Sequence, residues 1–241
     1  MVINNLTETH CHILPKIDDG SKSVEMSIEM INMLKAQGAE AIILTPHYYS
    51  DSISLEDFLA KRDRSFSMLK ESLPKDSPSL YLSAEVYMSS YLFNYENLDR
   101  LCIGNSRYML VEHRFSCDFG KDTFDRLTNL YCDYQIKPIL AHIERYDALM
   151  SDKELLKDYI DMGCLTQVNI NAFVNSTRKQ KKKLFKYLEH GLIHLIGSDC
   201  HNLDRRPPNY QDGINEIVKK YGTQPIEEFE KNAKRLLEGT I

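Results

Sequence analysis

The chain alternates between short apolar runs and longer amphipathic stretches. The apolar runs have the length and residue types of buried strands. They predict strands at Ile3–Thr9, Ala41–Thr45, Leu80–Ala84, Tyr108–Glu112, Pro138–Ala141, Thr166–Asn169 and His194–Ser198. Successive strands start 28–39 residues apart, a spacing typical of repeated strand–helix units whose strands run parallel.

The stretches between the strands place apolar residues at helical spacing. Ser21–Gln37 has an apolar stripe from Val24 to Leu34, and Gly38 marks its end. Similar stretches predict helices at Leu55–Leu73, Lys121–Gln135, Asp152–Asp161, Arg178–His190, Tyr210–Tyr221 and Pro225–Leu237. Parallel strands joined by helices form an open doubly wound sheet or a closed barrel. No glycine-rich turn follows the first strand, which argues against a dinucleotide-binding sheet.

The composition is that of a globular protein with a substantial core. Of the 241 residues, 42% are hydrophobic and 27% are charged, which are ordinary values. No stretch rich in Pro, Gly or Ser divides the chain, so we expect one domain over residues 1–241. No window of about 18 uncharged apolar residues predicts a membrane span. Met1–Glu8 lacks the basic and apolar segments of a secretory signal.

Charge and cysteine spacing exclude several function classes. The net charge is −5, from 30 basic and 35 acidic residues, which argues against nucleic-acid binding. The six cysteines include no CxxC pair, which argues against a zinc ribbon or a redox motif and predicts reduced thiols in the cytoplasm. The one dense basic run, Arg178–Lys183, is expected to be a solvated helix face or to attract an acidic or phosphorylated tail.

Side chains that can bind metals follow six of the seven predicted strands. They are His10 and His12, His47, Glu85, Glu112, His142, and Asp199 with His201. The carboxyl ends of parallel strands form one rim, so these side chains are expected to converge. Residues two apart in an extended chain point to the same side. His10 therefore faces the same way as His12, while Cys11 points away, and the same alternation turns Cys200 away from the rim.

This set of ligands indicates more than one metal ion. Five histidines, two glutamates and at least one aspartate exceed the four ligands of a tetrahedral zinc site. Mixed imidazole and carboxylate ligands without thiolate suit Mn, Fe or Zn, so the sequence predicts a cluster of two or three such ions. His113, His190 and His194 lie outside the pattern and are expected to be structural.

The motifs around these ligands resemble those of the polymerase and histidinol phosphatase (PHP) superfamily. Within it, they are similar to the bacterial manganese-dependent tyrosine phosphatases of capsule and exopolysaccharide operons. The matching segments follow in order along nearly the whole chain: His10-Cys11-His12, Asp18-Asp19-Gly20, Thr45-Pro46-His47, Ala84-Glu85, Val111-Glu112, Ala141–Tyr146 and Ser198–Pro208. The resemblance implies an α/β fold, a distorted (β/α)7 TIM-like barrel with the metal cluster at the C-terminal strand ends.

The resemblance also implies how the ligands are shared among metal ions. One ion would be held by His10, His12, Glu85 and Asp199, a second by Glu85, Glu112 and His142, and a third by Asp19, His47 and His201. The family usually opens with D-x-H-x-H, whereas this chain has Glu8 at the first acidic position. We expect the longer side chain of Glu8 to shift a contact to His10 or His12.

The activity implied by the resemblance is hydrolysis of phosphotyrosine, with manganese as the expected metal and iron or zinc as alternatives. A hydroxide held by the cluster would attack phosphorus, while Arg145 and Arg206 grip the non-bridging oxygens. The substrate would be a phosphotyrosine protein, a bacterial tyrosine autokinase that controls capsular or extracellular polysaccharide synthesis. Alternatively, Arg145 forms a surface ion pair and Arg206 belongs to a structural loop.

Other interpretations of the sequence stay open. A small-molecule phosphatase, such as a histidinol-phosphate phosphatase, would use the same cluster, and a non-catalytic binding module would keep the fold. Cys200 and Arg206 match the C-x5-R spacing of thiol-based tyrosine phosphatases, but no glycine lies between them to help wrap a phosphate, so we interpret the match as a coincidence. Tyr48 and Tyr49 either stack on a substrate ring or cover the barrel mouth.

Overall fold

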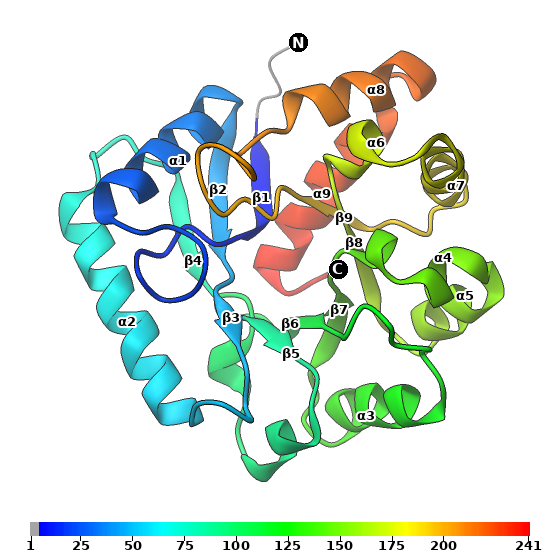
Figure 1. Ribbon diagram of the computed structural model, residues 1–241, viewed down its shortest axis with the longest axis horizontal. Coiled ribbons are helices and arrows are strands. Elements are labelled where there is room, and N and C mark those ends of the chain that lie inside the picture. Colours follow the sequence, from blue (N-terminus) through cyan, green and yellow to red (C-terminus); the bar gives the residue numbers. More distant parts are fainter. Residues whose placement is uncertain (1–4) are drawn as a thin grey trace.

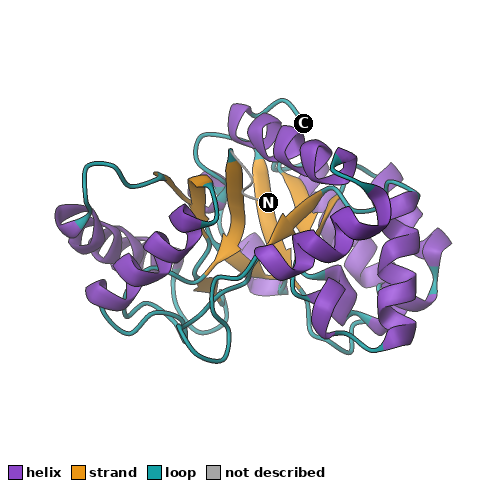
Figure 2. Ribbon diagram, turned by 90° about the horizontal axis from the view of Figure 1, so that it is seen from above, coloured by secondary structure: helices purple, strands orange, loops and turns teal. Residues whose placement is uncertain are grey.

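Parallel strands form the centre of the molecule and helices surround them (Figures 1 and 2). The structure is a computed structural model and describes residues 5–241. The strands in these residues are β1 (Leu6–Cys11), β2 (Ala39–Leu44), β3 (His47–Tyr48), β4 (Ser79–Leu82), β5 (Glu85–Tyr87), β6 (Tyr108–Glu112), β7 (Lys137–Leu140), β8 (Leu165–Asn169) and β9 (Leu195–Gly197).

The strands pair in two connected arcs. One has the order β1-β2-β4 and the other the order β3-β5-β6-β7-β8-β9, and every pairing between these strands is parallel. The chain just after β9 returns to β1: the Asp199 N–H donates to the His10 carbonyl (2.7 Å), and the His12 N–H donates to the Cys200 carbonyl (2.9 Å). The curled parallel sheet confirms the predicted distorted barrel.

Two of the predicted strands are interrupted and continue as short strands that the sequence did not separate. Ala41–Thr45 corresponds to β2, after which β3 begins, and Leu80–Ala84 corresponds to β4, after which β5 begins. Pro46 lies between β2 and β3 and has no N–H to donate, so it cannot continue the hydrogen-bond ladder of β2. The first predicted strand starts at residues 3 and 4, which lie outside the described residues. Its described part ends at Cys11 rather than at Thr9, so His10 belongs to the strand itself.

The helices are α1 (Val24–Ala36), α2 (Leu55–Ser72), α3 (Lys121–Cys132), α4 (Asp147–Ser151), α5 (Lys153–Asp161), α6 (Ala172–Asn175), α7 (Arg178–Glu189), α8 (Gln211–Tyr221) and α9 (Gln224–Glu238), with 3-10 turns at Ser90–Asn94, Asp99–Leu101 and Ile143–Arg145. All seven predicted helices are present. The sequence missed α4, α6 and the 3-10 turns because such short elements carry no measurable periodicity. No helix in residues 5–241 is both long and apolar enough to cross a membrane.

Local sequence signals explain where several helices begin and end. The Ser23 side chain accepts a hydrogen bond from the Met26 N–H at the start of α1. Thr177 and Gln180 form a capping box at the start of α7. Gly38 and Gly191 follow helix ends with φ of 95° and 67°, conformations that glycine adopts at little cost. The basic run at the start of α7 is exposed or half-buried, as expected for a solvated helix face.

The two ends of the barrel are covered differently. The C-terminal helix α9 packs against β1 and β9, and its Asn232 side chain donates to the carbonyl of His194, which directly precedes β9 (3.1 Å). Leu236 of α9 is fully buried with Tyr108 and Leu110 of β6 and Leu195 of β9. Helix α9 therefore closes the amino end of the barrel, and the carboxyl ends of the strands remain available for a site.

Candidate metal centre

The end of β1 and the start of β5 bring three buried side chains together. His10 Nε2 and His12 Nε2 are 3.3 Å apart, and each lies 3.2 Å from Glu85 Oε2. Both histidines are fully buried, and Glu85 is 1% exposed. Cys11 points to the opposite side and donates to the Ile43 carbonyl. The alternation along β1 therefore aims both imidazoles into one centre, as predicted.

Glu85 lies at the middle of the cluster. Its Oε2 is also 3.0 Å from His47 Nδ1, and its Oε1 is 2.9 Å from His142 Nε2. Glu112 completes this side of the cluster, with 3.5 Å from Oε1 to His142 Nε2 and 3.7 Å from Oε2 to His47 Nδ1. One carboxylate thus faces four imidazoles, two from the end of β1, one from the start of β3 and one from the turn after β7.

Asp19 and His201 form the outer part of the cluster. Asp19 Oδ1 lies 3.6 Å from His47 Nε2 and 3.4 Å from His201 Nε2, and the rings of His12 and His201 have centroids 3.9 Å apart. Compact candidate ligand groups are His12-Asp19-His47-His201, His10-His12-Glu85 and His47-Glu85-Glu112. His12 and His47 each belong to two groups, so the geometry mixes the three predicted ligand sets.

The residues of the cluster fit divalent cations. Several of their buried polar atoms form no well-aligned hydrogen bond, although ligands lie nearby: Glu85 Oε2, His47 Nδ1, His142 Nδ1 and His201 Nε2. Burial lowers the pKa of His142, but hydrogen bonds to Glu112 and Glu85 outweigh it and raise the pKa to about 9. Without a cation, protons on imidazoles balance the carboxylates. A cation satisfies the same oxygens and the unpartnered nitrogens.

Asp18 is a functional candidate that the sequence interpretation missed. Its Oδ2 lies 2.8 Å from His12 Nδ1 and accepts a hydrogen bond from the His47 N–H (3.1 Å). The interaction with His12 holds the pKa of Asp18 well below its usual range, despite the opposing effect of burial. Gly20 lets the turn pass close by, since a Cβ there would lie 2.1 Å from the His12 carbonyl oxygen. Asp18 therefore orients His12.

Two polar residues of β8 join ligands from three other strands. Gln167 Oε1 lies 3.2 Å from His10 Nδ1 and accepts from the His142 N–H (2.8 Å). Gln167 Nε2 donates to Asn169 Oδ1 (3.0 Å), and Asn169 Nδ2 donates to Asp199 Oδ2 (2.9 Å). The strand that ends without a ligand thus supplies a hydrogen-bond network behind the ligands. The sequence signal that could have predicted this network is the pair of amide residues, Gln167 and Asn169, which stand two apart on a buried strand and so face the same side.

Glu8 has a different role from the predicted one. Its side chain is fully buried, and its Oε1 accepts hydrogen bonds from the backbone N–H groups of His10 (2.9 Å) and Ser198 (3.0 Å) and from the Tyr210 hydroxyl (2.9 Å). The predicted contact with His10 is therefore made through the backbone N–H of His10 and not through its imidazole. Glu8 fastens the backbones of β1 and the chain after β9 to each other.

Two of the candidate ligands lie in the left-handed region of backbone conformation. His142 has a φ of 35° and Asp199 a φ of 54°, and each lies two residues after the last residue of a strand, β7 or β9. Such a conformation costs on the order of 1–3 kcal/mol for a residue other than glycine. Strain of this kind concentrates at functional sites, and here it occurs at the residues that turn toward the cluster.

Arg145 and Arg206 both reach the edge of the cluster. The Nη2 atom of each lies 2.5 Å from Asp199 Oδ2, and the side chains are 32% and 38% exposed. Burial lowers the pKa of Arg145, but the negative charges of Asp199, Glu144 and Glu85 outweigh this effect and raise the pKa above its usual value. The guanidinium therefore stays charged. Two positively charged guanidinium groups at the solvent side of the centre suit the binding of an oxyanion.

The loop after β9 argues against a thiol-based mechanism. Cys200 is a fully buried free thiol, and its backbone forms a parallel β-bridge with that of Cys11. Asn202 Oδ1 accepts hydrogen bonds from three backbone N–H groups of this loop, those of Asp204 (3.1 Å), Arg205 (2.7 Å) and Arg206 (3.0 Å). These N–H groups are therefore not free to wrap a phosphate, as the thiol mechanism requires.

The aromatic residues after β2 separate into two roles. Tyr48 is fully buried, and its ring centroid is 4.7 Å from that of Phe58, so it packs inside the molecule. Tyr49 is 37% exposed, and its ring lies 5.4 Å from that of His47 and 5.6 Å from that of Tyr87. Only Tyr49 of the predicted pair borders the centre.

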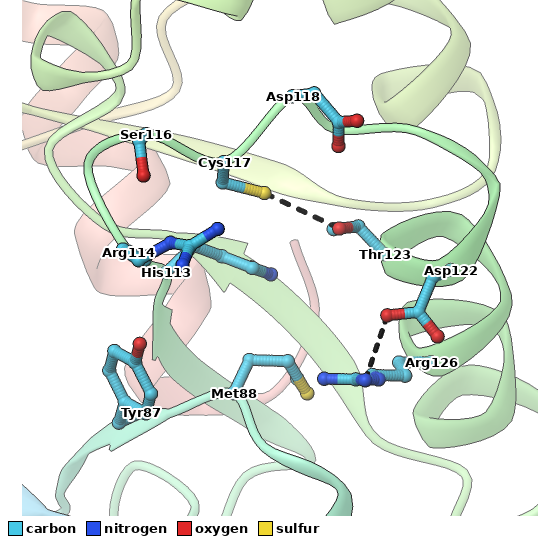
Figure 3. Close-up of a pocket in the computed structure, with 10 residues that line it drawn as sticks. All are labelled: Tyr87, Met88, His113, Arg114, Ser116, Cys117, Asp118, Asp122, Thr123 and Arg126. Carbon is cyan, nitrogen blue, oxygen red and sulfur yellow. Dashed lines mark hydrogen bonds and ion pairs between the residues drawn. The ribbon is translucent and has the colours of Figure 1, made fainter.

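A polar pocket opens beside the cluster, after the ends of β5 and β6 (Figure 3). Its volume is about 380 Å³, and it is lined by Tyr87, Met88, His113, Arg114, Ser116, Cys117, Asp118, Asp122, Thr123 and Arg126. Figure 3 shows the His113 side chain extending toward the middle of the pocket. Both ring nitrogens of His113 are buried without a partner, and burial lowers its pKa to about 3. His113 is therefore neutral, and it packs against Phe119 and Tyr146.

The other two histidines that were expected to be structural lie outside the cluster. His194 Nδ1 accepts a hydrogen bond from the Thr166 N–H (3.1 Å). His190 is the exposed C-cap residue of α7. Neither belongs to the candidate ligand groups of the described residues.

Comparison with known sequences identifies the family. Residues 6–238 match the family described as "Capsular polysaccharide synthesis, CpsB/CapC". The chain belongs to the CpsB/CapC family. The chain is similar to the tyrosine-protein phosphatase CpsB of Streptococcus agalactiae serotype V. The two are 32% identical over 243 residues, which cover 96% of this chain and 98% of the relative. The tyrosine-protein phosphatase YwqE of Bacillus subtilis is 28% identical, covering 96% of this chain and 91% of that one.

Solved structures agree with this CpsB/CapC assignment at the level of the fold. The chain is similar to a structure from work on YwqE of Bacillus subtilis and CpsB of Streptococcus pneumoniae, described as unique metal-dependent tyrosine phosphatases. That match has a TM-score of 0.81 at 23% identity and covers 98% of this chain and 96% of the other. A phosphotriesterase homology protein from Escherichia coli matches with a TM-score of 0.57 at 13% identity, over 95% and 97% of the two chains.

Proposed function

We propose that this CpsB/CapC chain is a metal-dependent protein-tyrosine phosphatase. The observation that carries the proposal is Glu85, a buried carboxylate among four imidazoles, with the guanidinium groups of Arg145 and Arg206 beside the same cluster. A cation site next to oxyanion-binding groups suits hydrolysis of a phosphate ester. The relatives named tyrosine-protein phosphatases support phosphotyrosine as the substrate.

The residues that would hold the metal ions are the nine predicted ligands. They are His10, His12, Asp19, His47, Glu85, Glu112, His142, Asp199 and His201. Manganese is the proposed metal, with iron or zinc as alternatives, because the ligands combine imidazole and carboxylate and lack thiolate. When bound, such cations lower the pKa of water from about 15.7 to near 7 and offset the negative charge of a phosphate.

The chain's own groups bind and orient the phosphate. Arg145 and Arg206 donate to Asp199 and remain about one-third exposed, so their other N–H groups can bind the non-bridging oxygens from the solvent side. Asn169 holds Asp199 in place from behind. Tyrosine has a pKa of about 10, so the phenolate departs more easily than an alkoxide and needs no strong general acid.

The substrate is proposed to be a phosphotyrosine protein, and more narrowly a bacterial tyrosine autokinase that controls capsular polysaccharide synthesis. The pocket beside the cluster is wide and polar, which suits the side chains of a polypeptide next to the phosphotyrosine. We also propose that residues 1–241 form one barrel domain, since buried residues from Leu6 to Phe229 share one core. The cytoplasmic location stays a prediction.

The decisive experiment compares substrates and metals. The chain is treated with a chelator, each of Mn, Fe, Zn and Mg is added back, and phosphate release is measured from a phosphotyrosine peptide and from histidinol phosphate. We expect chelation to abolish activity, one or more metals to restore it, and the phosphotyrosine peptide to be preferred. Activity that survives removal of all metal would overturn the metal mechanism. A preference for histidinol phosphate would establish the small-molecule alternative.

A further inference from the structure

Phe115 is the most exposed large apolar side chain among the described residues, at 57%. It lies three residues after Glu112 in the loop between β6 and α3. Leaving an aromatic ring of this size in water forgoes the favourable free energy of its burial. A ring that is exposed in the free protein can recover this free energy when a ligand covers it.

The surroundings of Phe115 place it at the substrate side of the centre. Its ring stands edge-on to the imidazole of His142, with centroids 6.2 Å apart and an interplanar angle of 74°. The guanidinium carbon of Arg145 lies over the same ring at 5.8 Å from its centroid. Phe115 therefore touches one candidate ligand and one of the two arginines proposed to bind phosphate.

We propose that Phe115 is the residue that recognises the aromatic ring of phosphotyrosine and so selects aryl over alkyl phosphate esters. The inference rests on the proposed phosphatase function. When Arg145 holds the phosphate, the phenyl ring attached to that phosphate projects within reach of the Phe115 ring. Aromatic pairs prefer offset or edge-to-face arrangements at centroid distances of about 4.5–7 Å, whereas an alkyl chain gains less from the same contact.

Tyr49 is another aromatic residue at the rim, but its contacts suit recognition of the substrate ring less well than those of Phe115. Its ring packs against Tyr87 and His47, and it is 37% exposed compared with 57% for Phe115. None of the contacts found in residues 5–241 joins Tyr49 to Arg145 or Arg206. Arg145 lies over the exposed ring of Phe115, so a phosphate and its aryl group can be held at once.

The test measures kcat/KM for phenyl phosphate and ethyl phosphate with the metal-loaded enzyme and its Phe115→Ala variant. We expect the variant to lose about three- to ten-fold on the aryl ester, which is the range of one aromatic pair, and clearly less on the alkyl ester. The comparison of variant with wild type on one substrate cancels the different basicity of the two leaving groups. Phe115→Tyr is expected to keep the aryl preference, and Phe115→Leu to lose most of it.

A direct binding measurement gives a second readout. Calorimetric titration with phenylphosphonate, compared with ethylphosphonate, is expected to show the same selective loss of affinity in Phe115→Ala. Phe124→Ala is the matched control, because Phe124 is also exposed at 37% but packs against Tyr159 rather than the cluster. Equal losses on aryl and alkyl compounds, or a loss in the control of the same size, would overturn the role of Phe115 while leaving the phosphatase function intact. A wild-type enzyme that hydrolyses neither ester nor a phosphotyrosine peptide would overturn the proposed function and this inference together.

Discussion

The two ends of the barrel are built on opposite principles. At the amino end, α9 covers the strands with apolar side chains such as Leu236, which is fully buried. At the carboxyl end, Glu85, His142 and His201 are almost as deeply buried, but they are polar and each leaves an atom without a hydrogen-bond partner. Burial therefore stabilises the fold at one end, whereas at the other end it costs free energy that cation binding can offset.

The strongest way to break this contrast is to remove the central carboxylate. Glu85→Gln keeps the size of the side chain but takes away the charge that faces four imidazoles. Changes in the surroundings of metal ligands already cost about 10–100-fold, so we expect more than 100-fold loss of both metal affinity and phosphatase activity. Metal content by mass spectrometry and activity check this together. Full metal content together with full activity in this variant would contradict the assignment of Glu85 as the central metal ligand.

At the amino end, the expected loss is in stability rather than in metal binding. Leu236→Ala leaves a cavity where α9 packs on β6 and β9, and a change of this kind lowers the free energy of unfolding by about 2–5 kcal/mol. Urea unfolding measures the stability, and metal titration of the folded variant measures affinity. A variant with unchanged stability, or with weakened metal binding while folded, would show that the two ends are not independent.

Arg145→Ala separates phosphate binding from metal binding at the carboxyl end. Loss of one group that stabilises charge in the transition state typically costs about 10²–10³ in rate, or roughly 2.7–4 kcal/mol. We expect the variant to keep its metal and to lose rate to this extent. Arg205→Ala is a matched control, since Arg205 is exposed in the same loop as Arg206. A rate unchanged by Arg145→Ala would remove this residue from the site.

Gln167→Ala tests whether the network behind the ligands positions them. It removes the contacts to His10 and to the backbone of His142, and an effect of about 10–100-fold on metal affinity is typical of such supporting residues. We expect excess metal to restore most of the activity. Weak activity that no metal concentration rescues would point instead to damage of the fold.

The smallest effect is expected at Cys200. Cys200→Ala changes a buried side chain that contacts the Cys11 strand and faces away from the cluster, so most of the activity should remain. A phosphate trapped covalently on Cys200 during turnover of the wild-type enzyme, or complete inactivity of a folded variant, would favour the thiol mechanism over the metal mechanism.

Much of the centre could be predicted from local sequence because its ligands stand where apolar runs stop. The two-residue alternation along β1 correctly aimed His10 and His12 together and turned Cys11 away. Short apolar runs predicted the strands of the barrel, and apolar residues at helical spacing predicted its long helices. The position of Gly38 predicted the end of a helix, because few residues other than glycine tolerate the backbone conformation found there.

Contacts between segments far apart in the chain could not be read in this way. The role of Glu8 depends on Tyr210, which lies about two hundred residues later but 2.9 Å away in space. Gln167 looked unremarkable because its partners, His10 and His142, come from other strands. Phe115 and Tyr48 are both aromatic residues near a strand end, yet one is exposed and the other fully buried.

The sequence by itself determined which residue types occupy the rim, because strand alternation and the ends of apolar runs are local properties of the chain. Only the tertiary structure decided which of these residues meet. The curl of the sheet sets the distances between strand ends, and the left-handed backbone at His142 and Asp199 turns those two residues toward the centre. Both depend on packing summed over the whole barrel, which no short stretch of sequence encodes.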